Sequence, residues 1–423
     1  MENMFNNLSL EKIYQYLLIS LAFLMPISVF GANLIIVIIV VLWLLSGSYK
    51  HKIKQIISSK FLLASIFFYC LHIIGMLWTN DLYWGLEILH KMWYFILLLP
   101  VLFTIVIKKN IKYYIIAFLA AIALTELISY LIWFELMTPF KVQFRLEPEI
   151  ALRVIQTEEI SMKLLANPTP FMTHVSYNPI LAFAIYLVLH EIFLNKKLDR
   201  VKFFLYSFFA ITMTFNMFIT GGRAGQVMFF VMLTILIFQF FNSEKVKSLI
   251  AIFILIPGVF YAAYQSSDLF QKRVDLAFHQ IVTYETNHNS SIGKRINYAL
   301  NSWEIIYANP ILGVGTGDFP SEFQKVSVAN NNQEHSITRN PHNMYHLILI
   351  QLGFVGLVSF LSIFYYQIKF SLSSSTEFLR DTGITLPLLY LVIMFSDSYL
   401  LGHFTSLLYV FFSSFLYKDF EKN

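Results

Sequence analysis

Thr220-Gly221-Gly222-Arg223-Ala224-Gly225-Gln226 lies between two apolar runs, and its residue types suit the binding of an anion. A helix that starts after two glycines directs free backbone N–H groups and the positive end of its dipole outward. Arg223 adds a planar guanidinium that fits phosphate oxygens. The segment therefore predicts an anion site at the end of a helix. The alternative is an arginine that extends from a helix end to lipid headgroups.

A second basic pair, Lys294-Arg295, opens a predicted amphipathic helix over residues 292–308. Apolar neighbours such as Ile296 and Tyr298 suggest that this helix lies on a membrane. Arg295 could then reach a lipid-linked phosphate. Basic pairs in loops are commonly just solvated, and that alternative stays open.

Asn340-Pro341-His342-Asn343-Met344-Tyr345-His346 predicts the start of a further helix, over 342–366, with Pro341 and His342 in its first turn. An ionisable group at the mouth of an apolar segment is a functional candidate. Gly353 and Gly356 are expected within about 40° of the His342 direction, so that another helix can pack closely there. A structural histidine bonded to a loop carbonyl is the alternative. The supporting candidates are Lys294, Arg339, Asn343 and His346.

Other polar residues predict little chemistry. Glu126, Glu135 and Asp397 are expected to be partners of basic residues or polar linings rather than catalytic acids. With one cysteine, Cys70, and no cluster of His, Asp or Glu at ligand spacing, no metal or other cofactor is predicted. The stretch 313–317, Gly-Val-Gly-Thr-Gly, is spaced like a phosphate loop but lacks the strand before it and the helix after it.

The elements that must position these residues are membrane helices. Of the 423 residues, 57% are hydrophobic and only 13% are charged, whereas a soluble domain carries roughly 25% charged residues. The net charge of +5 is concentrated in short loops, which favours membrane orientation over a nucleic-acid surface. The predicted fold class is all-α, a polytopic membrane protein.

A spanning helix needs about 20 mostly apolar residues. On this criterion residues 1–423 form a single transmembrane domain with about twelve helices. Two longer segments, 137–176 and 265–341, lie between the spans, and the second holds the amphipathic helix. The predicted helices lie near 12–29, 31–46, 61–78, 87–107, 112–136, 177–194, 201–220, 224–241, 247–264, 342–366, 383–400 and 402–418.

Lysine and arginine fall in alternate loops. If the N-terminus is cytoplasmic, the cytoplasmic loops hold clusters such as Lys108-Lys109 and Lys196-Lys197, whereas the short opposite loops near 30, 80–86 and 400 hold none. The positive-inside rule then predicts that both termini are cytoplasmic. The segments 137–176 and 265–341, together with all three candidate positions, are predicted on the external face.

Three local patterns resemble those of the O-antigen ligases, within the wider O-antigen ligase/polymerase superfamily. His342-Asn343, followed nine residues later by Gly353-x-x-Gly356, resembles the histidine pattern of the ligases. The stretch 309–315, Asn-Pro-Ile-Leu-Gly-Val-Gly, resembles a segment of the superfamily's large loop, and Gly221-Gly222-Arg223 resembles a superfamily helix start. The resemblance covers essentially the whole chain. It implies a GT-C-like layout with a partly helical periplasmic loop.

The resemblance also implies a reaction, in the bacterial inner membrane with the active site facing the periplasm. A polysaccharide passes from undecaprenyl pyrophosphate to the lipid A-core oligosaccharide, without metal or other cofactor. Arg223 and Arg295 match arginines that hold the pyrophosphate, and His342 matches the essential histidine.

We expect His342 to take the proton of the acceptor hydroxyl, because histidine ordinarily has a pKa of about 6.5 and is largely neutral at pH 7. The inversion of the anomeric centre follows from that attack. Orienting the pyrophosphate is the alternative role.

Other functions stay open on the sequence. An O-antigen polymerase would use a second lipid-linked glycan as acceptor, and a protein O-oligosaccharyltransferase would use a Ser or Thr side chain of a protein. A transporter of lipid-linked sugars would need ionisable groups deep in several helices. Membrane lipids are expected partners and nucleic acid is not, while a homodimer is left open.

Overall fold

The computed structural model describes residues 2–137, 168–195, 197–242, 244–284, 290–330 and 338–420, with side chains from residue 10 onward. All regular secondary structure in these residues is helical, as predicted. Most of the predicted external segment 137–176 lies outside the described residues. The chain forms two compact units: unit 1 is Met1–Leu18, Asn33–Ile111 and Ala277–Asn423, and unit 2 is Ile19–Ala32 and Lys112–Leu276.

The helices are those of a polytopic membrane protein. A helix lies at each of the predicted positions, and eight in the described residues are long and apolar enough to cross a membrane. A ninth follows if α2 (Val29–Leu45) and α3 (Tyr49–Ser58), which meet at a 115° bend, form one span. The number of spans therefore stays a prediction. The eight candidate spans are Lys60–Trp78, Leu82–Ile105, Lys108–Trp133, His174–Leu194, Arg200–Ile219, Arg223–Phe241, Lys245–Ser266 and Met344–Leu372.

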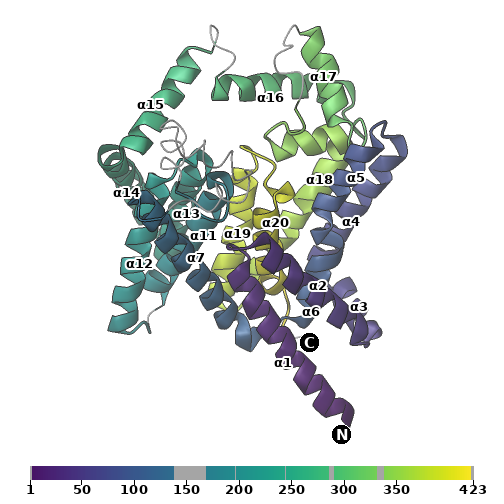
Figure 1. Ribbon diagram of the computed structural model, residues 1–423, viewed down its shortest axis with the longest axis vertical. Coiled ribbons are helices and arrows are strands. Elements are labelled where there is room, and N and C mark those ends of the chain that lie inside the picture. Colours follow the sequence, from purple (N-terminus) through teal and green to yellow (C-terminus); the bar gives the residue numbers. More distant parts are fainter. Residues whose placement is uncertain are drawn as a thin grey trace. The chain divides into compact units, whose positions relative to one another are not determined.

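The core of unit 1 is aromatic. α20 is buried from Thr405 to Leu416, so apolar side chains surround it on every side. Phe68 of α4 packs against Phe360 of α18 with ring centroids 5.1 Å apart. Figure 1 shows α4 running beside α18 in this unit. The main helices of unit 1 are α4 (Lys60–Gly75), α5 (Leu82–Met92), α6 (Leu99–Ile105), α16 (Ser291–Ala308), α17 (Phe319–Ala329), α18 (Met344–Leu372), α19 (Glu377–Ile393) and α20 (His403–Leu416).

The described part of the predicted external segment 265–341 is largely helical. The amphipathic helix expected over 292–308 is confirmed as α16, which begins after Ser290, whose hydroxyl accepts the N–H of Gly293 at 2.9 Å. α15 (Asp268–Val282) and α17 were not predicted. Their polar sequences lack the long apolar run by which the other helices were recognised.

α18 begins later than predicted, and this moves His342 out of the helix. Asn343 is the N-cap residue, and its side-chain oxygen accepts the N–H groups of Tyr345 and His346 at 2.9 and 3.1 Å. The prediction of Pro341 and His342 in the first helical turn is therefore wrong. The Asn343 side chain satisfies the first free N–H groups, so that the helix starts at the residue after it.

α18 is also interrupted, at Gly353, whose φ of 61° and ψ of −158° are not helical. The loop of residues 309–315 docks there, and the Phe354 N–H donates to the Pro310 carbonyl at 2.8 Å. A Cβ on Gly353 would lie 2.3 Å from the carbonyl of Ile311, so only glycine fits. The expected helix face shared by His342 and the glycines is wrong, because the break interrupts the helical repeat. The close neighbour of Gly353 is a loop.

The glycine-rich stretch 313–317 packs against backbone as well. A Cβ on Gly317 would lie 2.4 Å from the Gly85 nitrogen in α5. The carboxylate of Asp318, which follows, accepts the backbone N–H groups of Asn80 and Asp81 at 2.9 and 2.8 Å. These glycines thus bring a loop onto the α4–α5 turn, which accounts for their spacing without a phosphate.

Unit 2 has α11 at its centre. α11 is buried over most of its length and contacts both α12 and α13. Gly225 allows the close approach of α13, because a Cβ there would lie 2.2 Å from the Cβ of Asn178 in α11. Hydrogen bonds supplement this packing, since buried Asn216 donates to Ser129 at 2.9 Å and accepts from Tyr177 at 2.8 Å. The main helices of unit 2 are α7 (Ile111–Trp133), α11 (His174–Leu194), α12 (Arg200–Ile219), α13 (Arg223–Phe241) and α14 (Lys245–Ser266).

Candidate active site

His342 occupies a strained position immediately before the cap of α18. Its φ is 52°, a left-handed conformation that non-glycine residues seldom adopt. The Asn340 side chain fixes it, because its oxygen accepts the His342 N–H at 3.0 Å and the Ser398 hydroxyl at 2.8 Å. One residue beyond the cap, the Met344 N–H donates to the Met394 carbonyl at 2.9 Å. The histidine is thus held between the start of α18 and the loop after α19, and such strain persists where the surroundings impose it.

Asp397 lies beside the imidazole. His342 Nδ1 and Asp397 Oδ1 are 3.3 Å apart, within ion-pair distance, and the His342 side chain is 37% exposed. Burial opposes ionisation of Asp397, but His342, the Ser398 N–H and the Asn340 amide together hold the pKa of its carboxyl below the usual value. The expectation that Asp397 is the partner of a basic residue agrees with this contact. A carboxylate at Nδ1 favours the tautomer with its proton there, which leaves Nε2 available as a base.

α16 contributes the other face of the histidine. The Tyr298 ring stacks on His342 with centroids 5.8 Å apart and planes 16° apart. Arg295, one turn earlier on α16, is exposed and close enough to Tyr399 for its charge to act on that phenol. Burial is the main influence there and raises the pKa of Tyr399 to about 12. Arg295, Tyr298, His342 and Asp397 therefore belong to one cluster in unit 1.

The supporting candidates have different roles. Asn343 caps α18, so it acts on the backbone. Arg339 stacks over the indole ring of Trp84, with its guanidinium carbon 5.2 Å from the ring centroid. Lys294 is half-buried beside Arg295 in the first turn of α16. His346 lines a cavity next to α16, and its buried Nδ1 has no hydrogen-bond partner among the described residues.

Arg223 lies in unit 2, where it is the first residue of α13, as predicted, with Gly222 at the N-cap. It is half-buried. The turn before it is held by Asn178, whose amide donates to the Gly222 carbonyl at 3.3 Å and whose oxygen accepts the Thr220 hydroxyl at 2.7 Å. The N-terminus of a 19-residue helix and a guanidinium thus coincide. That is the chemistry of an anion site.

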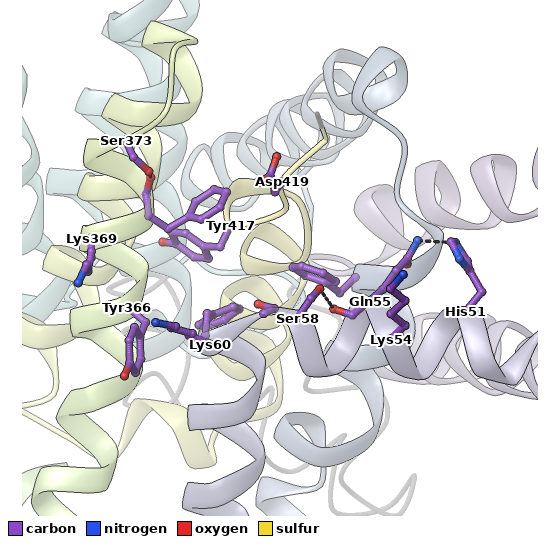
Figure 2. Close-up of a pocket in the computed structure, with 14 residues that line it drawn as sticks. His51, Lys54, Gln55, Ser58, Lys60, Tyr366, Lys369, Ser373, Tyr417 and Asp419 are labelled. Carbon is purple, nitrogen blue, oxygen red and sulfur yellow. Dashed lines mark hydrogen bonds between the residues drawn. The ribbon is translucent and has the colours of Figure 1, made fainter. Parts of the chain in front are cut away.

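A larger cavity than the one beside His346 lies elsewhere in unit 1. It measures about 720 Å³ and lies at the other end of α18, bounded also by α3, the start of α4 and the chain after α20. Figure 2 shows its lysines, Lys54, Lys60 and Lys369, and its aromatic residues Tyr366 and Tyr417. None of the predicted site residues lines it. The candidate active site is therefore the His342 cluster and not this larger cavity.

Two residues that contact His342 had no role in the sequence interpretation. Asn340 stood in the motif, but nothing indicated that it connects His342 to the 397–398 turn, 57 positions later in the chain. Tyr298 was read only as part of an apolar face. The only hint of these contacts in the sequence was Asp397, an acidic residue near the end of an apolar segment.

Two comparisons with known proteins bear on the chain. Residues 208–361 match the family model described as O-Antigen ligase. This range contains Arg223, Arg295 and His342, as well as the docking loop 309–315 and Gly353. No curated protein matches the chain.

Proposed function

We propose that this membrane protein is an O-antigen ligase, because residues 208–361 match the family model described as O-Antigen ligase. It transfers a polysaccharide from undecaprenyl pyrophosphate to a hydroxyl of the lipid A-core oligosaccharide, at the periplasmic face of the inner membrane. The observation that supports this most is the His342 cluster, a histidine with a carboxylate at Nδ1 and an arginine nearby, inside the matched range.

In the proposed reaction the acceptor hydroxyl attacks the anomeric carbon as its proton passes to Nε2 of His342. The C–O bond to the pyrophosphate breaks, and lipid pyrophosphate leaves from the opposite side, so the anomeric centre inverts. Asp397 stabilises the imidazolium that forms and keeps the ring oriented. A positioned base of this kind contributes roughly 10²–10⁴-fold to a rate.

Negative charge develops on the leaving pyrophosphate, and we assign its stabilisation to Arg295, which lies in the His342 cluster of unit 1. Fixed charges aimed at developing charge stabilise a transition state more than a ground state. In unit 2, Arg223 and the N-terminal dipole of α13 form a separate anion site that suits a phosphate of a lipid-linked substrate. Removing the Arg295 guanidinium should therefore lower the transfer rate more than it weakens binding of the intact donor.

Deletion of the gene in its host, followed by gel analysis of lipopolysaccharide, tests the proposal. A ligase predicts lipid A-core without any attached polymer, together with accumulated lipid-linked polymer, and a plasmid copy should restore the ladder. Core carrying a single repeat unit would instead identify a polymerase. An unchanged ladder would exclude both activities.

A further inference from the structure

A cavity of about 510 Å³ opens beside α16 in unit 1, on the same side as the start of α18. Its size is within the range of roughly 300–1,000 Å³ that is usual for ligand sites. Its walls are polar at several points, although α16 is an amphipathic helix with an exposed apolar stripe. The lining residues are Asn297, Asn301, Trp303, Glu304, Asn330 and His346, with Ala299 and Leu300.

Two buried asparagine side chains of this cavity have amide N–H groups without hydrogen-bond partners among the described residues. Asn297 and Asn301 are 5% and 2% exposed. Their oxygens are occupied, because Asn297 accepts the Tyr284 hydroxyl at 2.9 Å and Asn301 accepts the Asn330 amide at 3.2 Å. Both Nδ2 groups have no hydrogen-bond partner among the described residues. A buried unpaired donor costs about 1–3 kcal/mol, so these groups favour a ligand that brings oxygen acceptors.

The rim of the cavity adds an aromatic surface and an acceptor. Trp303 is 58% exposed, which leaves its indole ring accessible to a ligand. Glu304 accepts the Asn330 amide at 2.9 Å and offers a second oxygen for hydroxyl donors. An apolar ring face next to amide donors and a carboxylate matches a sugar, which has C–H faces and hydroxyl edges. A phosphate would instead call for cationic groups on these walls.

Three polar residues of this cavity lie on a different side of α16 from Arg295, whereas Ala299 and Trp303 of its lining lie nearer to Arg295. At 100° per residue, Asn297, Asn301 and Glu304 lie roughly 120–180° around α16 from Arg295. Tyr298 lies between the two faces and stacks on His342. The histidine is therefore placed between a charged side that suits pyrophosphate and an amide side that suits a glycan.

We propose that this cavity binds a sugar ring of the acceptor oligosaccharide and so presents a hydroxyl to His342. The inference rests on the proposed function, since the acceptor is defined by that reaction. Asn297 and Asn301 donate to sugar oxygens, Trp303 packs on a ring face, and Glu304 accepts from a hydroxyl. These residues determine acceptor affinity and are positioning rather than catalytic groups.

The test uses the full chain in detergent and core oligosaccharide released from the host's lipopolysaccharide, with binding measured by titration calorimetry. Asn297→Ala and Asn301→Ala should each weaken binding about tenfold, which corresponds to roughly 1.4 kcal/mol. Tyr307→Ala is the matched control, because Tyr307 is 85% exposed on the same helix and does not line the cavity. It should bind like the wild type.

A transfer assay distinguishes this inference from the proposed function. The two Asn variants should raise the acceptor KM and leave kcat and the donor KM near wild-type values, whereas His342→Ala should bind the oligosaccharide normally and lose transfer. Wild-type oligosaccharide affinity in both Asn variants, with transfer intact, overturns the cavity assignment alone. Normal transfer by His342→Ala contradicts the proposed mechanism and leaves the binding result standing. Thermal unfolding of each variant checks that it is folded.

Discussion

At the scale of single residues, the site depends on how His342 is held. Its backbone is left-handed, its amide is bound by Asn340, its ring stacks on Tyr298, and its Nδ1 faces Asp397. Each contact restricts the backbone or the ring orientation, both of which would be mobile in an exposed histidine. A base whose ring is already oriented needs less reorganisation during the reaction.

Replacing Asp397 with asparagine should separate orientation from charge. Asp397→Asn keeps the shape but removes the carboxylate at Nδ1, so the glycosyl transfer rate should fall by about 10- to 100-fold. Asp199→Asn is the control, because Asp199 caps α12 and asparagine caps a helix equally well. Equal rates for the wild type and Asp397→Asn would show that the carboxylate plays no part.

The same substitution should affect stability in a pH-dependent way. The pKa of Asp397 is lowered in the folded protein, so its ionised form stabilises the fold. That contribution is complete above the ordinary carboxyl pKa of about 3.9 and is lost as the pH falls through the lowered folded value. The Tm of Asp397→Asn should therefore lie below that of the wild type between pH 5 and 7. The gap should begin to narrow below about pH 4, and a gap of the same size at pH 3 as at pH 6 would contradict this account.

At the scale of elements, the break in α18 is the main departure from the sequence interpretation. Hydropathy predicted an apolar helix there, and that is confirmed, because burial in the membrane or the core depends on composition and period. The break was not predicted, since Gly353 reads like any glycine in a membrane helix. Its cause is the loop 309–315, which lies about forty positions earlier, and single-helix periodicity carries no information about such docking.

Gly353→Ala tests the docking. A Cβ at this positive φ would meet the Ile311 carbonyl, so we expect a loss of stability on the order of 3 kcal/mol, from strain and overpacking together. Gly258→Ala is the matched control, since Gly258 lies inside α14, next to Pro257, and nothing lies within 4 Å of a Cβ there. That variant should be neutral or slightly stabilised. Thermal unfolding in detergent measures both, and an unchanged Tm for Gly353→Ala would refute the docked break.

At the scale of the whole molecule, composition and the apolar runs predicted the class correctly, a multi-pass helical membrane protein. The two-unit organisation was not predicted, because it depends on which helices contact one another. The candidate site was located only in part. His342 and Arg295 carry local motifs, whereas Tyr298 and Asp397 contact His342 from distant parts of the chain and Asn340 links it to Ser398.

Cysteine labelling tests the predicted orientation. In a Cys70→Ser background, Asn330→Cys at the end of α17 should react with a membrane-impermeant maleimide in spheroplasts, because the segment is predicted external. Lys54→Cys on α3 is the paired control, and it should react only after permeabilisation. The reverse pattern would place the candidate site in the cytoplasm and contradict the proposed reaction.

The central claim is that His342 is the base of a glycosyl transfer, and the initial rate of transfer by purified His342 variants tests it most directly. The substrates are the lipid-linked polysaccharide and lipid A-core. His342→Ala should lose roughly 10²–10⁴-fold in kcat, and neither His342→Lys nor His342→Gln should restore it, because a largely protonated lysine and an amide cannot accept the proton at neutral pH. Near wild-type transfer by His342→Lys would show that a positive charge suffices and that His342 orients the pyrophosphate instead.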